Sequence, residues 1–218
     1  MQPWMLEAPS FQITPQEERI FRAALEVRNA RVLPPDVPRW VFLEWLVRAG
    51  HLLHGSPIAD LPELIPQHRN YAQPDDFSNT HGVYAASDGL WAMMYALTPP
   101  GTQRSDMALR LRQPDGSWSS TRYFSSLGGP AETDGRALLR PGVVYVLNRE
   151  GFTRSPAYDH PGLGFVQEGH WVRPTPVEPV MTVPVLPDDF PLPIRVHDAA
   201  EVRRRAQADP WGFPWLEQ

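Results

Sequence analysis

The chain has 218 residues, no cysteine and a net charge of −5 at pH 7. This length is enough to bury a core without disulfides or metals, and the lack of cysteine excludes disulfides, thiol catalysis and cysteine-based metal sites. All 20 basic residues are arginine, which we attribute to GC-rich coding DNA, and the acidic balance argues against a nucleic-acid partner. The 26 prolines argue against a helical bundle or a coiled coil.

The sequence also argues against contact with a membrane. It has no apolar run of the roughly 18 residues that a transmembrane helix needs. Residues 1–7 lack both the basic segment and the long apolar segment of a secretory signal. We therefore expect a cytoplasmic protein.

Two amphipathic helices are predicted near the N-terminus. Thr14, followed by Pro15 and then by Glu17, is typical of a helix start, so a helix is expected over 15–31. A second helix is expected over 38–49, with Gly50 ending it.

The next part of the chain predicts two short strands around a long loop. The run 51–54 is expected to be a strand, followed by a turn at 55–57. Residues 57–82 are polar and rich in turn residues, and loops of this length are often functional, so we expect 66–81 to cover a cleft. The second strand is expected at 82–86.

A buried helix and a largely β region follow. Ser87 or Asp88 is expected to cap a helix that runs to about Leu97, before two prolines. From residue 106 the apolar residues alternate, and Asp115-Gly116 predicts a hairpin turn. Further strands are expected at 143–147 and, broken by prolines, at 170–185, with a short helix near 199–208 and an aromatic tail.

This order of elements predicts an α+β fold with a bent or split antiparallel sheet. We divide the chain into an N-terminal helical segment (1–50), a central domain (51–198) and a C-terminal helix with its tail (199–218). The three parts are expected to form one compact domain.

Six residues stand in an order that suggests chemistry. His54, Gly55 and Ser56 end the first predicted strand, Tyr84 lies in the second strand, Tyr95 lies on the helix after it, and Glu168 opens the last β segment. This order resembles the His-Tyr-Glu branch of the ADP-ribosyltransferase fold, which contains diphtheria-toxin-like enzymes and the poly(ADP-ribose) polymerases. The resemblance covers about residues 51–186.

The resemblance implies split antiparallel β-sheets with a cleft for NAD, preceded here by the N-terminal helices. It implies that NAD is the substrate, that the bond between nicotinamide and ribose is cleaved, and that ADP-ribose passes to an acceptor, a protein or a small molecule, or to water. His54 would orient the adenosine ribose, Gly55 and Ser56 would bind the nicotinamide amide, and Tyr84 and Tyr95 would stack on its ring. Glu168 would stabilise the oxocarbenium-like charge, so His54 and Glu168 are the expected catalytic residues.

The sequence departs from the family pattern at two positions. Ala92 stands where the family helix often carries a small hydroxyl residue, which removes one donor to the nicotinamide amide. Val166 stands two residues before Glu168, where arginine-modifying members carry Glu or Gln, so arginine is disfavoured as the acceptor. Glu150 competes with Glu168 as the catalytic carboxylate, and Glu168 is preferred because an extended β segment follows it.

Other functions stay open at this stage. The chain could be an inactive member of the same fold that binds nucleotides or proteins, or it could carry out the related tRNA 2′-phosphotransferase reaction, against which the acidic balance argues. A metal site is not expected. His51 and His54 have ligand-like spacing, but two residues at this spacing point to opposite faces of a strand.

Overall fold

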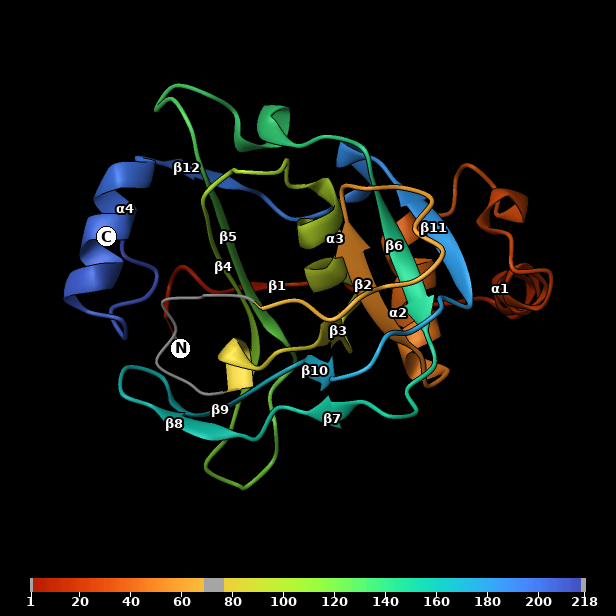
Figure 1. The fold of residues 1–218 in the computed structure, drawn as a ribbon, viewed down its shortest axis with the longest axis horizontal. Coiled ribbons are helices and arrows are strands. Elements are labelled where there is room, and N and C mark those ends of the chain that lie inside the picture. Colours follow the sequence, from red (N-terminus) through yellow and green to blue (C-terminus); the bar gives the residue numbers. More distant parts are fainter. Residues whose placement is uncertain (1, 69–76, 217–218) are drawn as a thin grey trace.

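The computed structural model describes residues 2–68 and 77–216. In these residues four α-helices and twelve strands form two sheets, with α1 and α2 at one end of the molecule and α4 at the other (Figure 1). The predicted α+β class is confirmed. No helix of the described part combines the length and the apolarity needed to cross a membrane.

Each sheet has six strands, and every pair is antiparallel except β12 with β5. The first sheet has the order β1 (Leu6–Glu7), β5 (Arg122–Gly128), β4 (Arg104–Leu111), β9 (Gly164–Glu168) and β8 (Tyr158–His160), and β12 (Arg195–His197) joins β5. The second sheet has the order β11 (Met181–Val185), β6 (Gly142–Leu147), β2 (Leu52–Ser56), β3 (Val83–Ala86), β10 (His170–Arg173) and β7 (Thr153–Arg154).

The predicted helices are present. Thr14 and Glu17 form a capping box at the start of α1, because each side chain accepts from the other residue's backbone N–H. The helix ends at Glu26, earlier than predicted, and Arg28 follows in the left-handed region with φ of 53°. The α-helices are α1 (Pro15–Glu26), α2 (Arg39–Arg48), α3 (Gly89–Leu97) and α4 (Ala199–Ala208), and short 3₁₀ turns lie at Ala30–Val32, Phe77–Asn79, Gly135–Leu138 and Pro187–Asp189.

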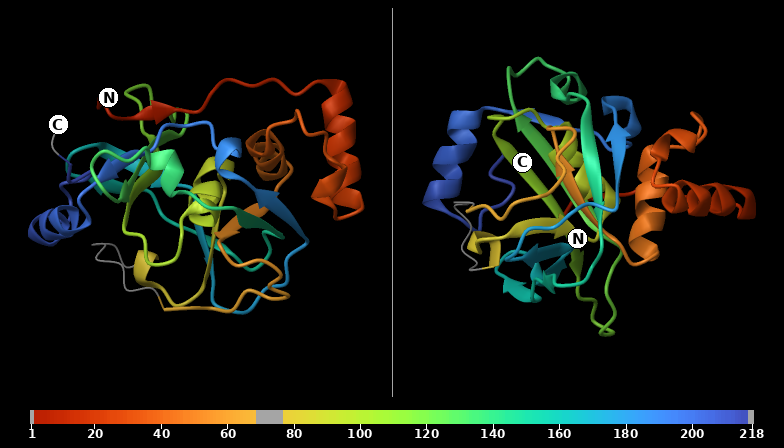
Figure 2. Two further views of the ribbon diagram at one scale, coloured as in Figure 1. Left: turned by 90° about the horizontal axis from the view of Figure 1, so that it is seen from above. Right: turned by 45° about the vertical axis from the view of Figure 1, so that its right-hand side comes forward.

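Helix α3 is the centre of the molecule and lies between the two sheets (Figures 1 and 2). Asp88 caps it, and eight of its nine residues are buried, with Tyr95 as the exception. Two glycines let the helix backbone approach the second sheet directly. A Cβ at Gly55 would overlap the Ala92 carbonyl oxygen, and one at Gly142 would overlap the Ala96 carbonyl oxygen.

The second sheet opens between β2 and β3. Strand β2 pairs with β6 over five residues, but it pairs with β3 only at Leu53 and Ala86. Beyond this pair the His54 ring bridges the two strands, with Nδ1 2.7 Å from the Tyr84 carbonyl oxygen. The opening faces α3 and forms the candidate site.

Three predictions from the sequence need correction or limits. The expected turn at 55–57 starts later, because β2 continues through Ser56. Glu168 does not open a strand but ends β9 of the first sheet, and after Gly169 the chain enters β10 of the second sheet. Of the loop expected to cover a cleft, residues 69–76 lie outside the described residues.

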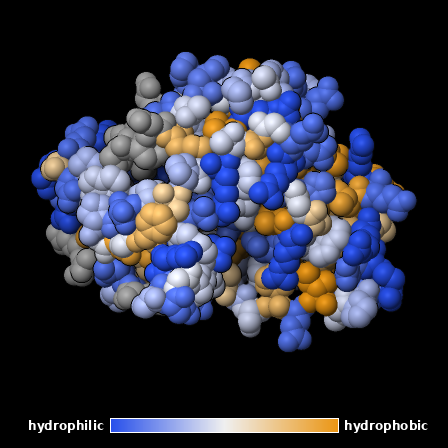
Figure 3. Space-filling view, turned by 90° about the horizontal axis from the view of Figure 1, so that it is seen from below, coloured by the Kyte–Doolittle hydropathy of each residue, from blue (hydrophilic) through white to orange (hydrophobic). Residues whose placement is uncertain are grey.

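One face of the molecule is largely hydrophilic, and the C-terminal tail packs on the first sheet. Figure 3 views the molecule from the side on which β7, β8 and β9 lie in Figure 1, and this face is largely hydrophilic, with apolar residues in small groups. In the C-terminal tail Phe213 packs against Trp4 and Phe124, so the aromatic tail covers part of the first sheet.

Candidate functional site

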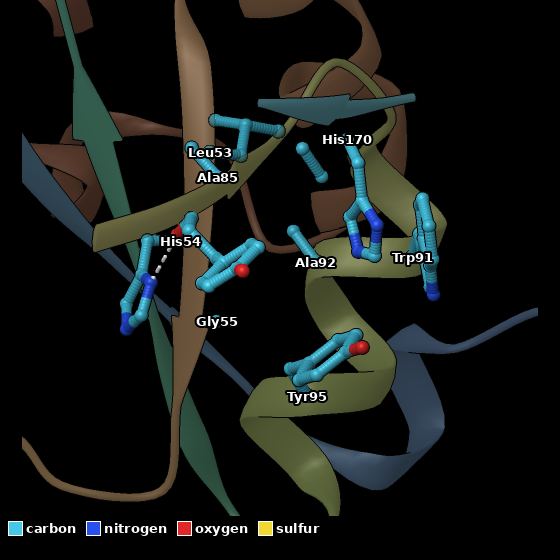
Figure 4. Close-up of a pocket in the computed structure, with 10 residues that line it drawn as sticks. Leu53, His54, Gly55, Ala85, Trp91, Ala92, Tyr95 and His170 are labelled. Carbon is cyan, nitrogen blue, oxygen red and sulfur yellow. Dashed lines mark hydrogen bonds between the residues drawn. The ribbon is translucent and has the colours of Figure 1, made fainter. Parts of the chain in front are cut away.

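A narrow crevice lies where β2, β3, α3 and β10 meet (Figure 4). Its volume is about 20 Å³, which is room for a single water molecule. The crevice brings together four of the six residues singled out in the sequence. Its polar and aromatic lining residues are His54, Tyr84, Trp91, Tyr95 and His170, and Gly55 and Ala92 also line it.

His54 is held in a fixed orientation. Its Nδ1 lies 2.7 Å from the Tyr84 carbonyl oxygen, which can only accept, so Nδ1 carries a proton and donates. In the neutral ring Nε2 is then an acceptor. The His54 side chain is half-buried, and this tautomer suits a ligand hydroxyl group that donates to Nε2.

Tyr84 and Tyr95 differ in their surroundings. Tyr84 is buried, and its hydroxyl lies 2.8 Å from the carbonyl oxygens of both Phe77 and Thr80, which ties the ring to the last part of the long loop. Tyr95 is half-buried, and the Arg104 guanidinium carbon lies 3.8 Å from its ring centre. Tyr95 packs against the edge of the main core and keeps part of its side chain exposed.

Close packing against α3 requires a glycine at position 55. The sequence suggested that it allows a ligand to approach the backbone, but the missing Cβ leaves space for the α3 backbone instead. Ser56 lies outside the crevice. Its side chain is buried, accepts from the Ile58 N–H at 3.1 Å and lines a neighbouring hollow of about 590 Å³. That hollow also contains His54, Tyr84 and Tyr95.

Glu168 lines a second hollow beside the crevice, with a volume of about 250 Å³. This hollow shares Tyr95, Trp91 and His170 with the crevice. One carboxylate oxygen accepts from the Tyr158 hydroxyl at 3.1 Å, and the other lies 3.1 Å from His170 Nδ1. His170 lines both the crevice and the hollow that contains Glu168. Tyr95 also lines both spaces, so Glu168 adjoins the part of the crevice that Tyr95 lines.

The competing glutamate has a different position. Glu150 is exposed in the turn after β6, and it lines none of the three hollows. Its backbone carbonyl oxygen accepts from the Arg173 guanidinium at 3.1 Å. Of the two carboxylates, only Glu168 lies beside the predicted site residues.

His170 and its neighbours were missed in the sequence. The His170 ring stacks on Trp91, with ring centres 4.0 Å apart and planes at 22°. The Trp91 Nε1–H donates to Asp106 at 3.1 Å, and Arg104 lies 3.5 Å from Asp106. The spacing of Glu168 and His170, two residues apart, was the one available signal, because such residues point to the same side of an extended chain.

The described residues contain no group of three or more His, Cys, Asp and Glu side chains that could hold a metal ion. No protein-family model matches the sequence, and no curated protein or solved structure is significantly similar to it. The function must therefore be argued from the site itself.

Two carboxyl groups lie beneath the site, at the N-terminus of α3. Asp88 accepts from the Trp91 N–H at 2.8 Å and from the Tyr123 hydroxyl at 2.6 Å, and Glu44 of α2 accepts from the Gly89 N–H at 2.7 Å. Burial and the nearby Asp88 carboxylate raise the pKa of Glu44 to about 8, and burial raises the pKa of Asp88. The helix that carries Tyr95 thus rests on groups that resist ionisation.

Glu44→Gln is expected to make the free energy of unfolding less dependent on pH. In the unfolded wild-type chain Glu44 loses its proton near pH 4.5, but in the folded protein it keeps the proton up to about pH 8, so stability is lost as the pH rises through this interval. We expect the Glu44 part of this loss to be on the order of 2–4 kcal/mol. Glutamine keeps the acceptor for Gly89 and removes the titration.

Urea unfolding at about pH 5 and about pH 8 measures the effect. The exposed Glu26→Gln is the matched control and should keep the pH dependence of the wild type. An unchanged pH dependence in Glu44→Gln would contradict the buried carboxyl assignment.

Proposed function

We propose that the chain binds NAD across the crevice and its two neighbouring hollows, and that it breaks the bond between nicotinamide and ribose. One observation carries this proposal. His54 and Gly55 of β2, Tyr84 of β3 and Tyr95 of α3 line one crevice, and Glu168 of β9 lines a hollow that adjoins it. Residues far apart in the sequence thus meet in the set expected from the resemblance to ADP-ribosyltransferases.

The combined space supports an extended dinucleotide. The two hollows measure about 590 and 250 Å³, and Tyr95 and Arg104 line both. The rings of Tyr84, Trp91 and Tyr95 supply flat surfaces on which a nicotinamide ring can stack, and the Arg104 guanidinium is a partner for a diphosphate. Because the crevice between the hollows is narrow, we expect the His170 ring to shift when the ligand binds.

In the proposed reaction the C1′–N1 bond breaks, its electron pair leaves with nicotinamide, and positive charge develops on the ribose. The Glu168 carboxylate stabilises this charge, as a preorganised negative group. An acceptor oxygen or nitrogen then bonds to C1′ and releases its proton to solvent, and with water as the acceptor the product is free ADP-ribose. Before the substrate binds, the Tyr158 hydroxyl donates to one Glu168 oxygen, and His170 Nδ1 lies 3.1 Å from the other without forming a hydrogen bond.

The acceptor stays open between a protein, a small molecule and water. Val166 precedes Glu168 by two residues and offers no polar group to an incoming arginine side chain. The net charge of −5 argues against a nucleic-acid acceptor. A cytoplasmic location is part of the same proposal.

One observation favours a second candidate function. The crevice has a volume of only about 20 Å³, and the stacked pair of His170 and Trp91 forms part of its wall. If this pair stays in place, a nucleotide can occupy the hollow of about 590 Å³ without reaching Glu168. The chain would then be a nucleotide-binding or protein-interaction module of the same fold class without turnover.

Millimolar NAD is expected to raise the thermal unfolding midpoint of the wild type. At 100 times the dissociation constant a ligand adds about 2.7 kcal/mol, which corresponds to a rise of roughly 5–10 °C for a chain of this size. His54→Ala should lose most of this rise, because Nε2 no longer accepts from a ribose hydroxyl. Differential scanning fluorimetry with and without NAD measures both.

His51→Ala is the matched control, since His51 lies three residues earlier and does not line the three hollows. It should keep the NAD-dependent rise. If NAD leaves the wild-type midpoint unchanged, both the transferase and the nucleotide-binding candidates are wrong.

A further inference from the structure

A second hollow lies on the other side of the strands that carry Glu168 and His170. Successive residues of a strand point to opposite faces, and the two sites follow this alternation. Glu168 and His170 line the proposed NAD site, whereas Gln167 and Trp171 line a hollow of about 670 Å³. The second hollow is separate from the site described above.

Four arginines line this second hollow. Arg48 of α2 lies with its guanidinium carbon 4.5 Å from the Phe11 ring centre, and the other three are Arg110 of β4, Arg149 of the turn after β6, and Arg154 of β7. The guanidinium carbons of Arg149 and Arg154 lie 4.1 and 5.8 Å from the centre of the Trp171 ring. Among the described residues no carboxylate oxygen lies within 4.0 Å of any of the four. The hollow therefore concentrates positive charge without an internal counter-ion.

The positive charges of Arg110, Arg149 and Arg154 repel one another. Burial and the positive charges of Arg110 and Arg149 lower the pKa of Arg154. Asp88 also lines the hollow, but its two oxygens already accept from the Trp91 N–H and the Tyr123 hydroxyl. Its carboxyl group is used within the fold and does not neutralise the arginines.

Donors in the hollow also lack partners. The Nε atom of Arg154 and the Nε1 atom of Trp171 are buried and make no hydrogen bond, and the Trp171 side chain is only 6% exposed. A buried donor without a partner costs about 1–3 kcal/mol, so an acceptor that reached both groups would stabilise the fold. Arginine forks match the oxygens of a phosphate group in particular.

We propose that this second hollow binds a phosphate-bearing small molecule, with its phosphate oxygens on Arg149 and Arg154. Trp118 lines the same hollow and adds a flat aromatic surface, so a nucleotide phosphate suits the hollow better than inorganic phosphate does. The proposal does not depend on the NAD site, because no residue of this hollow lines the crevice.

Isothermal titration at low ionic strength with pyrophosphate and with AMP tests the proposal. We expect both probes to bind the wild type, and the double variant Arg149→Gln/Arg154→Gln to bind them at least about tenfold more weakly. Arg19→Gln/Arg203→Gln is the matched control, because both arginines are exposed on helices and the change in net charge is equal. His54→Ala should bind pyrophosphate as the wild type does.

The double variant is expected to fold, because it removes mutual repulsion, and its midpoint without ligand should be equal to or above that of the wild type. A pyrophosphate-induced rise in the wild-type midpoint that the double variant lacks is the second readout. Absence of binding to the wild type, equal binding to both double variants, or loss of binding in His54→Ala would each overturn the proposal. So would a single-stranded oligonucleotide that binds this hollow more tightly than AMP does.

Discussion

Replacing Glu168 with glutamine is expected to lower the rate of nicotinamide release from NAD by roughly 10²–10³. Glutamine keeps the shape of the side chain and can still accept from the Tyr158 hydroxyl, but it lacks the negative charge that stabilises the developing charge on the ribose. The loss should fall on kcat, with little change in NAD affinity, because the charge interaction is made mainly in the transition state. Steady-state kinetics together with NAD titration separates the two effects.

Glu150→Gln is the control for this experiment. Glu150 is exposed and lies outside the three hollows, so its variant should keep the wild-type rate. If Glu168→Gln is fully active and Glu150→Gln is inactive, the assignment of the catalytic carboxylate is wrong, although the proposed reaction would stand.

Gly55→Ala is expected to lower the free energy of unfolding by about 3 kcal/mol or more. The new Cβ would overlap the Ala92 carbonyl oxygen and lie 2.7 Å from the Ala96 backbone nitrogen. Both atoms belong to the backbone of α3, which is packed between two sheets and cannot yield as a flexible side chain does. Urea unfolding of the variant and the wild type measures the loss.

Gly169→Ala is a suitable comparison. The nearest atom to a Cβ at this position is the Ser87 side-chain oxygen at 3.3 Å, and moving this hydroxyl would cost only its long hydrogen bond of 3.3 Å to the Gly169 carbonyl oxygen. We expect a loss below about 1 kcal/mol. If Gly55→Ala is as stable as Gly169→Ala, α3 does not rest on β2 as described, and the crevice would have a different shape.

The local part of the fold could be predicted from the sequence. The capping box of α1 is a contact between residues three apart, and the Asp88 cap of α3 follows the same local rule. The end of β2 was predicted less well, because the glycine that suggested a turn is in fact required by α3, a partner about 40 residues away in the chain.

Four of the six residues singled out in the sequence line one crevice, but their contacts could not be predicted. His54, Gly55, Tyr84 and Tyr95 could be grouped by their order, and the structure brings them together. The position of His170 beside Trp91 could not be predicted, because it depends on the pairing of β10 with β3 in the second sheet while β9 pairs with β4 in the first. Strand pairing between distant segments leaves no local signal in the sequence.

Nicotinamide release from NAD by the wild-type protein tests the central proposal most directly. The protein is incubated with NAD for hours, with and without candidate acceptors, and nicotinamide is quantified by chromatography next to the Glu168→Gln variant. The proposed function predicts release in excess of the protein concentration, with ADP-ribose either free or attached to an acceptor, and far slower release by the variant. Release by the wild type no faster than in buffer alone would contradict the enzymatic function and leave the nucleotide-binding candidate.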